Sequence, residues 1–124
     1  MANETELTII GNLTADPEQR TTSSGKNVAN LTIASSPRVF DRQNSRWMDG
    51  EPLFMQCSAW GPLADHIGAS LAKGMKVIAH GRLTQRSYRT KEGQERTLFE
   101  MTLDDIGPAL SRAVAAVTKA EAGK

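Results

Sequence analysis

Alternating hydrophobic and polar positions divide the chain into short segments that predict a protein built of β-strands. Alternation with a period of two places successive side chains on opposite faces of a strand. The polar stretch Pro37–Pro52 predicts a long hairpin loop, and Thr90–Arg96 predicts a charged hairpin tip. We expect five strands, which span Leu7–Gly11, Val28–Ser36, Leu53–Trp60, Lys76–Tyr88 and Thr97–Leu103.

A helical spacing replaces the alternation between the third and fourth strands. Leu63, Ile67 and Leu71 recur at every fourth position and would share one face of a helix. Pro62 suits the first position of that helix, and Gly74 supplies a stop after it. One internal helix is therefore expected here.

The order of three strands, a helix and two strands is the layout of an OB-fold, a five-stranded Greek-key barrel in the all-β class. Gly81, in the middle of the fourth strand, predicts a bulge or bend that suits barrel closure. After Gly107-Pro108, the spacing of Leu110, Val114 and Val117 predicts a short C-terminal helix. We expect a barrel domain over residues 1–107 and a helical extension over 108–124.

Composition narrows the class of protein further. The chain has 124 residues, of which 39% are hydrophobic and 23% charged, as expected of one globular domain. A single cysteine, Cys57, excludes an internal disulfide framework, and its position on an apolar face predicts a buried side chain. The polar N-terminus does not resemble a signal peptide, and no apolar stretch approaches membrane-spanning length. We therefore expect a cytoplasmic protein.

Residue patterns typical of enzymes are scarce. The two histidines and one cysteine have no metal-ligand spacing, and glycine-rich phosphate loops are missing, so no metal or cofactor is expected. Glu100, Asp104 and Asp105 could be imagined as a divalent-metal nuclease site, although strand-end acids facing solvent explain them more simply. The sequence favours a protein that is not an enzyme.

Aromatic residues occupy polar faces of the predicted strands. In the predicted strand Leu53–Trp60 (LFMQCSAW), one face carries the apolar core residues. Phe54 and Trp60 lie on the opposite face, together with Gln56. Tyr88 likewise shares a face with arginines of the fourth strand, and Phe40 and Trp47 lie in or beside the arginine-bearing loop. Of the six aromatic residues, only Phe99 is predicted on a core face.

Aromatic and basic residues interleaved in this way are typical of a surface that binds nucleic acid. The net charge of +1 conceals two local basic stretches, at Arg38–Trp47 and Arg82–Arg96. Bases stack on aromatic rings while cations follow the phosphates, and only single strands expose their base faces. A sequence-independent binder of single-stranded DNA is the leading hypothesis. An OB-fold module that uses the aromatic residues as a protein or RNA interface is the alternative.

Five longer stretches resemble the bacterial single-stranded DNA-binding protein family, in its actinobacterial type. The resemblance runs from about Glu6 to Gly107. The stretches are IIGNLTADPEQR (9–20), VANLTIASSPRVFDRQ (28–43), WMDGEPLFMQCSAWG (47–61), LAKGMKVIAHGRLTQRSY (71–88) and EGQERT (92–97).

The resemblance implies a homotetramer that wraps single-stranded DNA in replication, recombination and repair, associated with the nucleoid. Gln56 and Pro62 stand where family members often have basic residues. From the residues and the resemblance together, the expected stacking side chains are Phe40, Phe54, Trp60 and Tyr88, with Trp47 as either a stacking residue or a loop anchor. The expected phosphate contacts are Arg38, Arg42, Lys73, Arg82 and Arg86.

Family members usually continue into a flexible linker and an acidic tip that recruits other DNA-metabolism proteins. This sequence ends at Glu-Ala-Gly-Lys without either. A trimmed sequence and a tail-less form both remain open, so recruitment through a tip is not expected of these residues.

Overall fold

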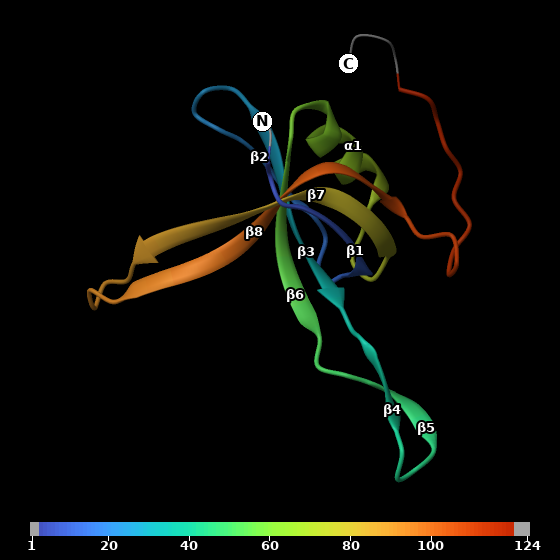
Figure 1. The fold of residues 1–124 in the computed structure, drawn as a ribbon. Coiled ribbons are helices and arrows are strands. Elements are labelled where there is room, and N and C mark those ends of the chain that lie inside the picture. The colour runs from blue at the N-terminus through green and yellow to red at the C-terminus, as the bar shows by residue number, and fades with distance from the viewer. Residues whose placement is uncertain (1–2, 121–124) are drawn as a thin grey trace.

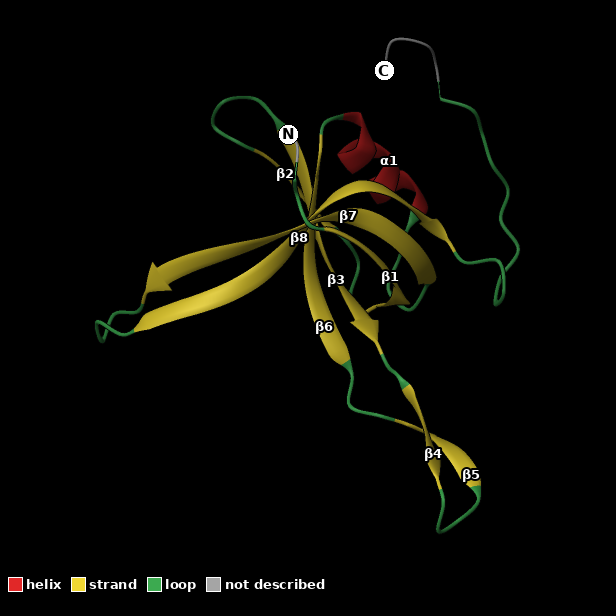
Figure 2. Cartoon of the chain, in the orientation of Figure 1, coloured by secondary structure: helices red, strands yellow, loops and turns green. Residues whose placement is uncertain are grey.

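Five strands of the chain close into a barrel, and two hairpins extend from it (Figures 1 and 2). The structure is a computed structural model that describes residues 3–120. In chain order, its elements are β1 (Glu6–Leu13), β2 (Glu18–Thr21), β3 (Asn27–Ser35), β4 (Arg38–Asp41), β5 (Arg46–Asp49), β6 (Leu53–Trp60), α1 (Pro62–Ser70), β7 (Lys76–Arg89) and β8 (Glu95–Pro108).

The strand order confirms the predicted OB-fold barrel. Neighbours around the barrel are β1, β7, β8, β6 and β3, and β1 pairs again with β3 to close the ring. The β6–β8 pairing is parallel and the others are antiparallel. These five strands are the five expected from the sequence, with α1 between the third and the fourth. All five begin or end within a few residues of the predicted positions, except that β8 continues to Pro108.

Alternating inward positions of the five strands fill the core. The largest fully buried side chains include Ile33 of β3, Val77 of β7 and Met101 of β8. Helix α1 contributes Ile67 and Ala64 to this core. Cys57 is also buried, as predicted, and its burial raises the pKa of the thiol to about 12, so it stays protonated at neutral pH.

Gly81 lies at an irregularity in the β7–β8 pairing, as predicted. His80 pairs with Asp105 and Gly81 with Leu103, so Asp104 is an extra residue on β8. A Cβ atom at Gly81 would lie 2.2 Å from the Thr102 carbonyl oxygen. The close approach of the two backbones therefore requires glycine here.

Three short elements differ from the sequence-based expectation. The stretch predicted as a long loop contains the β4–β5 hairpin, a separate two-stranded sheet. The bend after β1 contains β2, which pairs with β3. Both β2 and β5 are exposed along their whole length, so neither carries the alternation that identified the other strands.

The predicted C-terminal helix is wrong for the part that the structure describes: residues 109–120 contain no helix. Leu110, Val114 and Val117 are exposed and gain no burial against the barrel. A helix of this length is marginal without tertiary packing, and β-branched valines lower its propensity further. Residues 121–124 of the predicted extension lie outside the described range. Among residues 3–120, no helix is long and apolar enough to cross a membrane.

The close contact at Gly81 gives a test of the barrel. We expect Gly81→Ala to lower the free energy of unfolding by about 1–3 kcal/mol, because the added methyl group meets backbone rather than a movable side chain. Gly107→Ala, in the paired strand β8, is the matched control: nothing lies within 4 Å of its added Cβ, so its effect should stay within about 0.5 kcal/mol. Urea unfolding followed by far-UV circular dichroism measures both. Equal stabilities of the two variants would contradict the assigned contact.

Candidate nucleic-acid interface

Outward side chains of β7, β8, β6 and β3 form one continuous surface, which we call the outer face. The register joins Thr84 to Glu100, Glu100 to Gln56, and Gln56 to Thr32 across these four strands. Directly paired residues point to the same side of a sheet, so this row lies on one face. Phe54 and Trp60 lie on this face, on either side of Gln56 along β6.

Two cross-strand pairs extend this face along the β7–β8 hairpin, beyond the end of the barrel. Arg86 pairs with Leu98, and Tyr88 pairs with Arg96, and both β7 residues follow Thr84 at alternate positions. The hairpin projects away from the barrel in Figure 1. The alternation predicted that Tyr88 and Arg86 share one side of their strand, and the register places that side on the same face as Phe54 and Trp60.

The aromatic rings of the outer face remain open to solvent. Phe54 is 60% exposed, Trp60 45% and Tyr88 48%. Large hydrophobic side chains at these positions do not stabilise the core, so they are available to contact a flat apolar partner.

The β4–β5 hairpin carries a pair of rings that touch each other. Phe40 lies opposite Trp47, with centroids 5.4 Å apart and planes at 69°, an edge-to-face contact. Both rings are nevertheless exposed. Trp47 therefore contacts Phe40 within the hairpin and is still 60% exposed, so its stacking role stays a prediction.

Polar contacts hold the shape of this hairpin. At its base the Gly50 N–H donates to the Pro37 carbonyl at 2.6 Å. At its tip the Asp41 carboxylate accepts hydrogen bonds from the Asn44 side chain and the Gln43 backbone, and these contacts lower the pKa of Asp41. These hydrogen bonds hold the tip in place. Ser45 has a positive φ of 50°, a backbone conformation that usually favours glycine.

Phe99 corrects the expectation that it belongs to the core. Met101 and Leu103 are buried on the predicted side of β8, but Phe99, two residues earlier, is 54% exposed. At Phe99 the strand has already left the barrel, so the inward direction no longer meets the hydrophobic core. Leu53, at the start of β6, is exposed for the same reason. All six aromatic residues of the chain are therefore at least 45% exposed.

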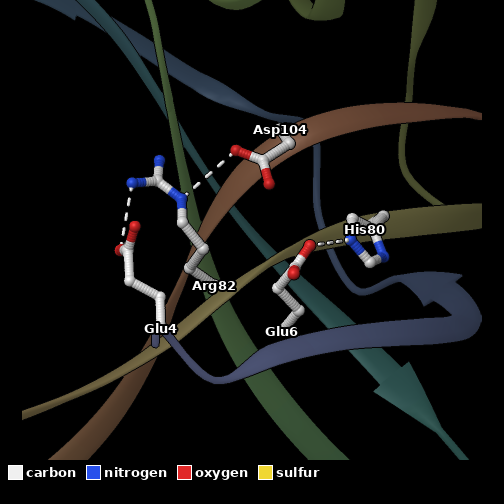
Figure 3. Close-up of polar contacts among 5 residues, drawn as sticks. All are labelled: Glu4, Glu6, His80, Arg82 and Asp104. Atoms are coloured by element: carbon white, nitrogen blue, oxygen red, sulfur yellow. Dashed lines mark hydrogen bonds and ion pairs between the residues drawn. The ribbon is translucent and has the colours of Figure 1, made fainter. Parts of the chain in front are cut away.

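Three of the five predicted phosphate-binding residues already contact carboxylates. The guanidinium of Arg86 lies 3.0 Å from Glu100, and that of Arg38 lies 3.2 Å from Asp49. Both arginine side chains are more than 60% exposed, where an ion pair contributes about 0–1 kcal/mol and can exchange for a phosphate. Arg82 is held by two carboxylates, those of Glu4 and Asp104 (Figure 3).

The remaining two predicted cations are placed differently. Within residues 3–120, the side chains of Arg42 and Lys73 form no ion pair. Arg42 lies in the turn between β4 and β5, near the ring pair. Lys73 lies in the turn between α1 and β7, outside the outer face, and its backbone N–H donates to Asp16 at 2.8 Å.

The acids considered for a nuclease site do not form one cluster. Glu100 contacts Arg86, Asp104 contacts Arg82, and Asp105 accepts a hydrogen bond from the Ile106 N–H. In the described part of the chain, the metal-binding side chains that converge are instead Glu6, His80 and Asp104. Sequence reasoning missed this group because its members come from three separate strands.

Comparison with known proteins gives consistent matches. The model of the single-strand binding protein family matches residues 4–109. A single-stranded DNA-binding protein of Bifidobacterium longum is 58% identical over 124 residues, which cover all of this chain and 57% of that protein. A single-stranded DNA-binding protein of Mycobacterium bovis is 53% identical over 120 residues, covering 97% of this chain and 73% of the relative. The chain thus spans little more than half of the first of these relatives.

A solved structure has the same architecture. The crystal structure of a small single-stranded DNA-binding protein from Streptomyces coelicolor superimposes with a TM-score of 0.77 and 32% sequence identity. The match covers 90% of this chain and 99% of that one.

Proposed function

The chain belongs to the single-strand binding protein family, and from this premise we propose that it binds single-stranded DNA without sequence preference. In this role it coats and protects single strands during replication, recombination and repair. The activity is binding rather than catalysis. Its proposed location is the cytoplasm, in association with the nucleoid.

The observation that carries the proposal is the set of exposed rings on a polar and basic surface. Phe54, Trp60 and Tyr88 share the outer face with Arg86, and the Phe40–Trp47 pair lies on the adjoining hairpin. Stacking of a base on an aromatic side chain contributes about 1–3 kcal/mol and tolerates any base. A duplex hides its base faces, so these rings favour single strands.

Electrostatics supplies the second part of the proposed mechanism. Arg42 and Lys73 are available to phosphates directly, whereas Arg38 and Arg86 exchange a carboxylate for a phosphate. Gln56, between the rings of β6, adds no charge. We therefore expect stacking to contribute more than phosphate neutralisation, and a moderate dependence of affinity on salt.

We further propose that the chain assembles as a homotetramer. Ile10 of β1 and Ile78 of β7 pair directly on the outside of the barrel and are 49% and 45% exposed. Residues 6–12 of β1 pair with β7 on one side, and β1 pairs with β3 only at Asn12 and Leu13. An exposed apolar pair beside an incompletely paired strand supports contact with a second copy.

The stacking mechanism is tested by alanine substitutions with a matched control. Trp60→Ala should weaken binding of oligo-dT by about 5- to 150-fold, because one base loses its platform. Phe99→Ala removes a ring of similar exposure from the opposite side of the β7–β8 hairpin and should leave the affinity unchanged. Fluorescence anisotropy of labelled oligo-dT measures both. Equal affinity for single- and double-stranded DNA, or equal loss in both variants, would favour an interface role for the rings.

The Arg86–Glu100 ion pair predicts a gain of function. Glu100→Gln should release Arg86 for phosphate, raising affinity at low salt and steepening the log–log salt dependence by about 0.7. Asp105→Asn makes the same change in net charge at the other end of β8 and should leave the slope unchanged. If both variants steepen it equally, the effect comes from overall charge rather than from Arg86.

Assembly is tested separately from DNA binding. Multi-angle light scattering of the protein without DNA should give four times the mass of one chain. Ile78→Lys should reduce that mass, because it places a charge in the proposed contact. Leu110→Lys makes the same change at an exposed apolar residue beyond β8 and should preserve the tetramer. A monomeric wild-type protein would contradict the assembly while leaving the stacking mechanism standing.

A further inference from the structure

A histidine and two carboxylates meet on the outside of the barrel, where β1, β7 and β8 run side by side. Glu6, His80 and Asp104 each offer a ligand atom, and these atoms lie within 4.8 Å of one another (Figure 3). We propose that these three side chains form a binding site for a zinc ion. The site is independent of the proposed DNA-binding function.

The register of the strands places the three ligands together. Thr8 pairs with His80, and Glu6 precedes Thr8 by two residues on β1, so both side chains lie on the same side as His80. On β8, the irregularity opposite His80 and Gly81 inserts Asp104 as the extra residue. A bulge of this kind commonly redirects a side chain at a functional position.

Distances within the group suit a first-row metal ion. His80 Nε2 lies 3.0 Å from Glu6 Oε1. Two ligands of a tetrahedral zinc ion with bonds of about 2.0–2.1 Å are separated by about 3.3 Å. A small side-chain adjustment therefore admits an ion between these two atoms, in place of their hydrogen bond.

The second nitrogen of His80 is already oriented. Nδ1 lies 2.8 Å from the Thr8 hydroxyl oxygen. In the tautomer whose Nδ1–H donates to that oxygen, Nε2 carries the lone pair that would bind the ion. Metal-bound histidines almost always have such a partner on their other nitrogen, because it fixes the ring and its tautomer.

The charge and exposure of the group also favour a divalent cation. Glu6 and Asp104 bring two carboxylates to one imidazole, and the side chains of His80 and Asp104 are each 44% exposed. Arg82 contacts Oδ1 of Asp104 at 3.2 Å and is shared with Glu4, so the other oxygen of Asp104 is left for the ion. Imidazole suits zinc, whereas magnesium and calcium prefer oxygen ligands alone. Three protein ligands leave one position for water.

Isothermal titration of the untagged full chain with zinc chloride, without DNA, tests the site. We expect one zinc ion per chain. His80→Ala and Asp104→Asn should each weaken binding by at least about tenfold, since loss of even an outer partner has that effect. His66→Ala is the matched control, because it removes the other histidine, which is exposed on α1. Thr8→Val, which removes only the partner of Nδ1, should weaken binding by about tenfold.

A spectroscopic measurement keeps the test independent of folding effects. Cobalt(II) should give the strong visible absorption of a tetrahedral site in the wild type and in His66→Ala, and not in His80→Ala. Circular dichroism reports whether each variant is folded. If His80→Ala does not fold, Glu6→Gln, which preserves the shape of the side chain, replaces it as the test variant. Zinc affinity that is unchanged by His80→Ala and Glu6→Gln, or displacement of zinc by an equal concentration of magnesium, would overturn the proposal.

Discussion

Closure of the barrel between β1 and β3 is the constraint on which the rest of the structure depends. Only two residue pairs make this contact, Asn12 with Ala34 and Leu13 with Ile33. Gly11 permits it, because a Cβ at this position would lie 2.3 Å from the Ala34 carbonyl oxygen. Once the ring is closed, every barrel strand has a buried side and an outer side. The rings on β6 and β7 are then forced outward, since their neighbours along each strand already fill the core.

The sequence predicted those features that depend on local alternation. The five barrel strands, helix α1 and the irregularity at Gly81 were all expected, as were the outward positions of Phe54, Trp60 and Tyr88. What alternation cannot give is where a strand leaves the barrel. Phe99 has the right parity for the core but lies beyond its end, and the C-terminal segment has helical spacing but no surface to pack on. Side-chain contacts between paired strands, such as Arg86 with Glu100, also require the register, which no local pattern contains.

The ion pairs bear on how a chain with a net charge of only +1 could bind the single-stranded DNA that we propose as its partner. Arg38 and Arg86 are each held by one exposed carboxylate, and such pairs are weak in water. A polyanion competes with a single carboxylate because it offers several phosphates in a row and releases its counterions on binding. Arg82 differs, since two carboxylates hold it and its side chain is less exposed. Through these two contacts it links the segment before β1 to β8.

Strand β7 connects the two surfaces for which we propose partners. Its 14 residues extend over about 46 Å, longer than the barrel needs. The half after Gly81 carries Arg86 and Tyr88 on the outer face, and the half before it carries Ile78 and His80 beside β1. An ion bound at His80 would join β1 to β7 and β8 next to the exposed Ile10–Ile78 pair. It would therefore act on the stability of the barrel and on the proposed contacts between copies, rather than on the proposed stacking rings.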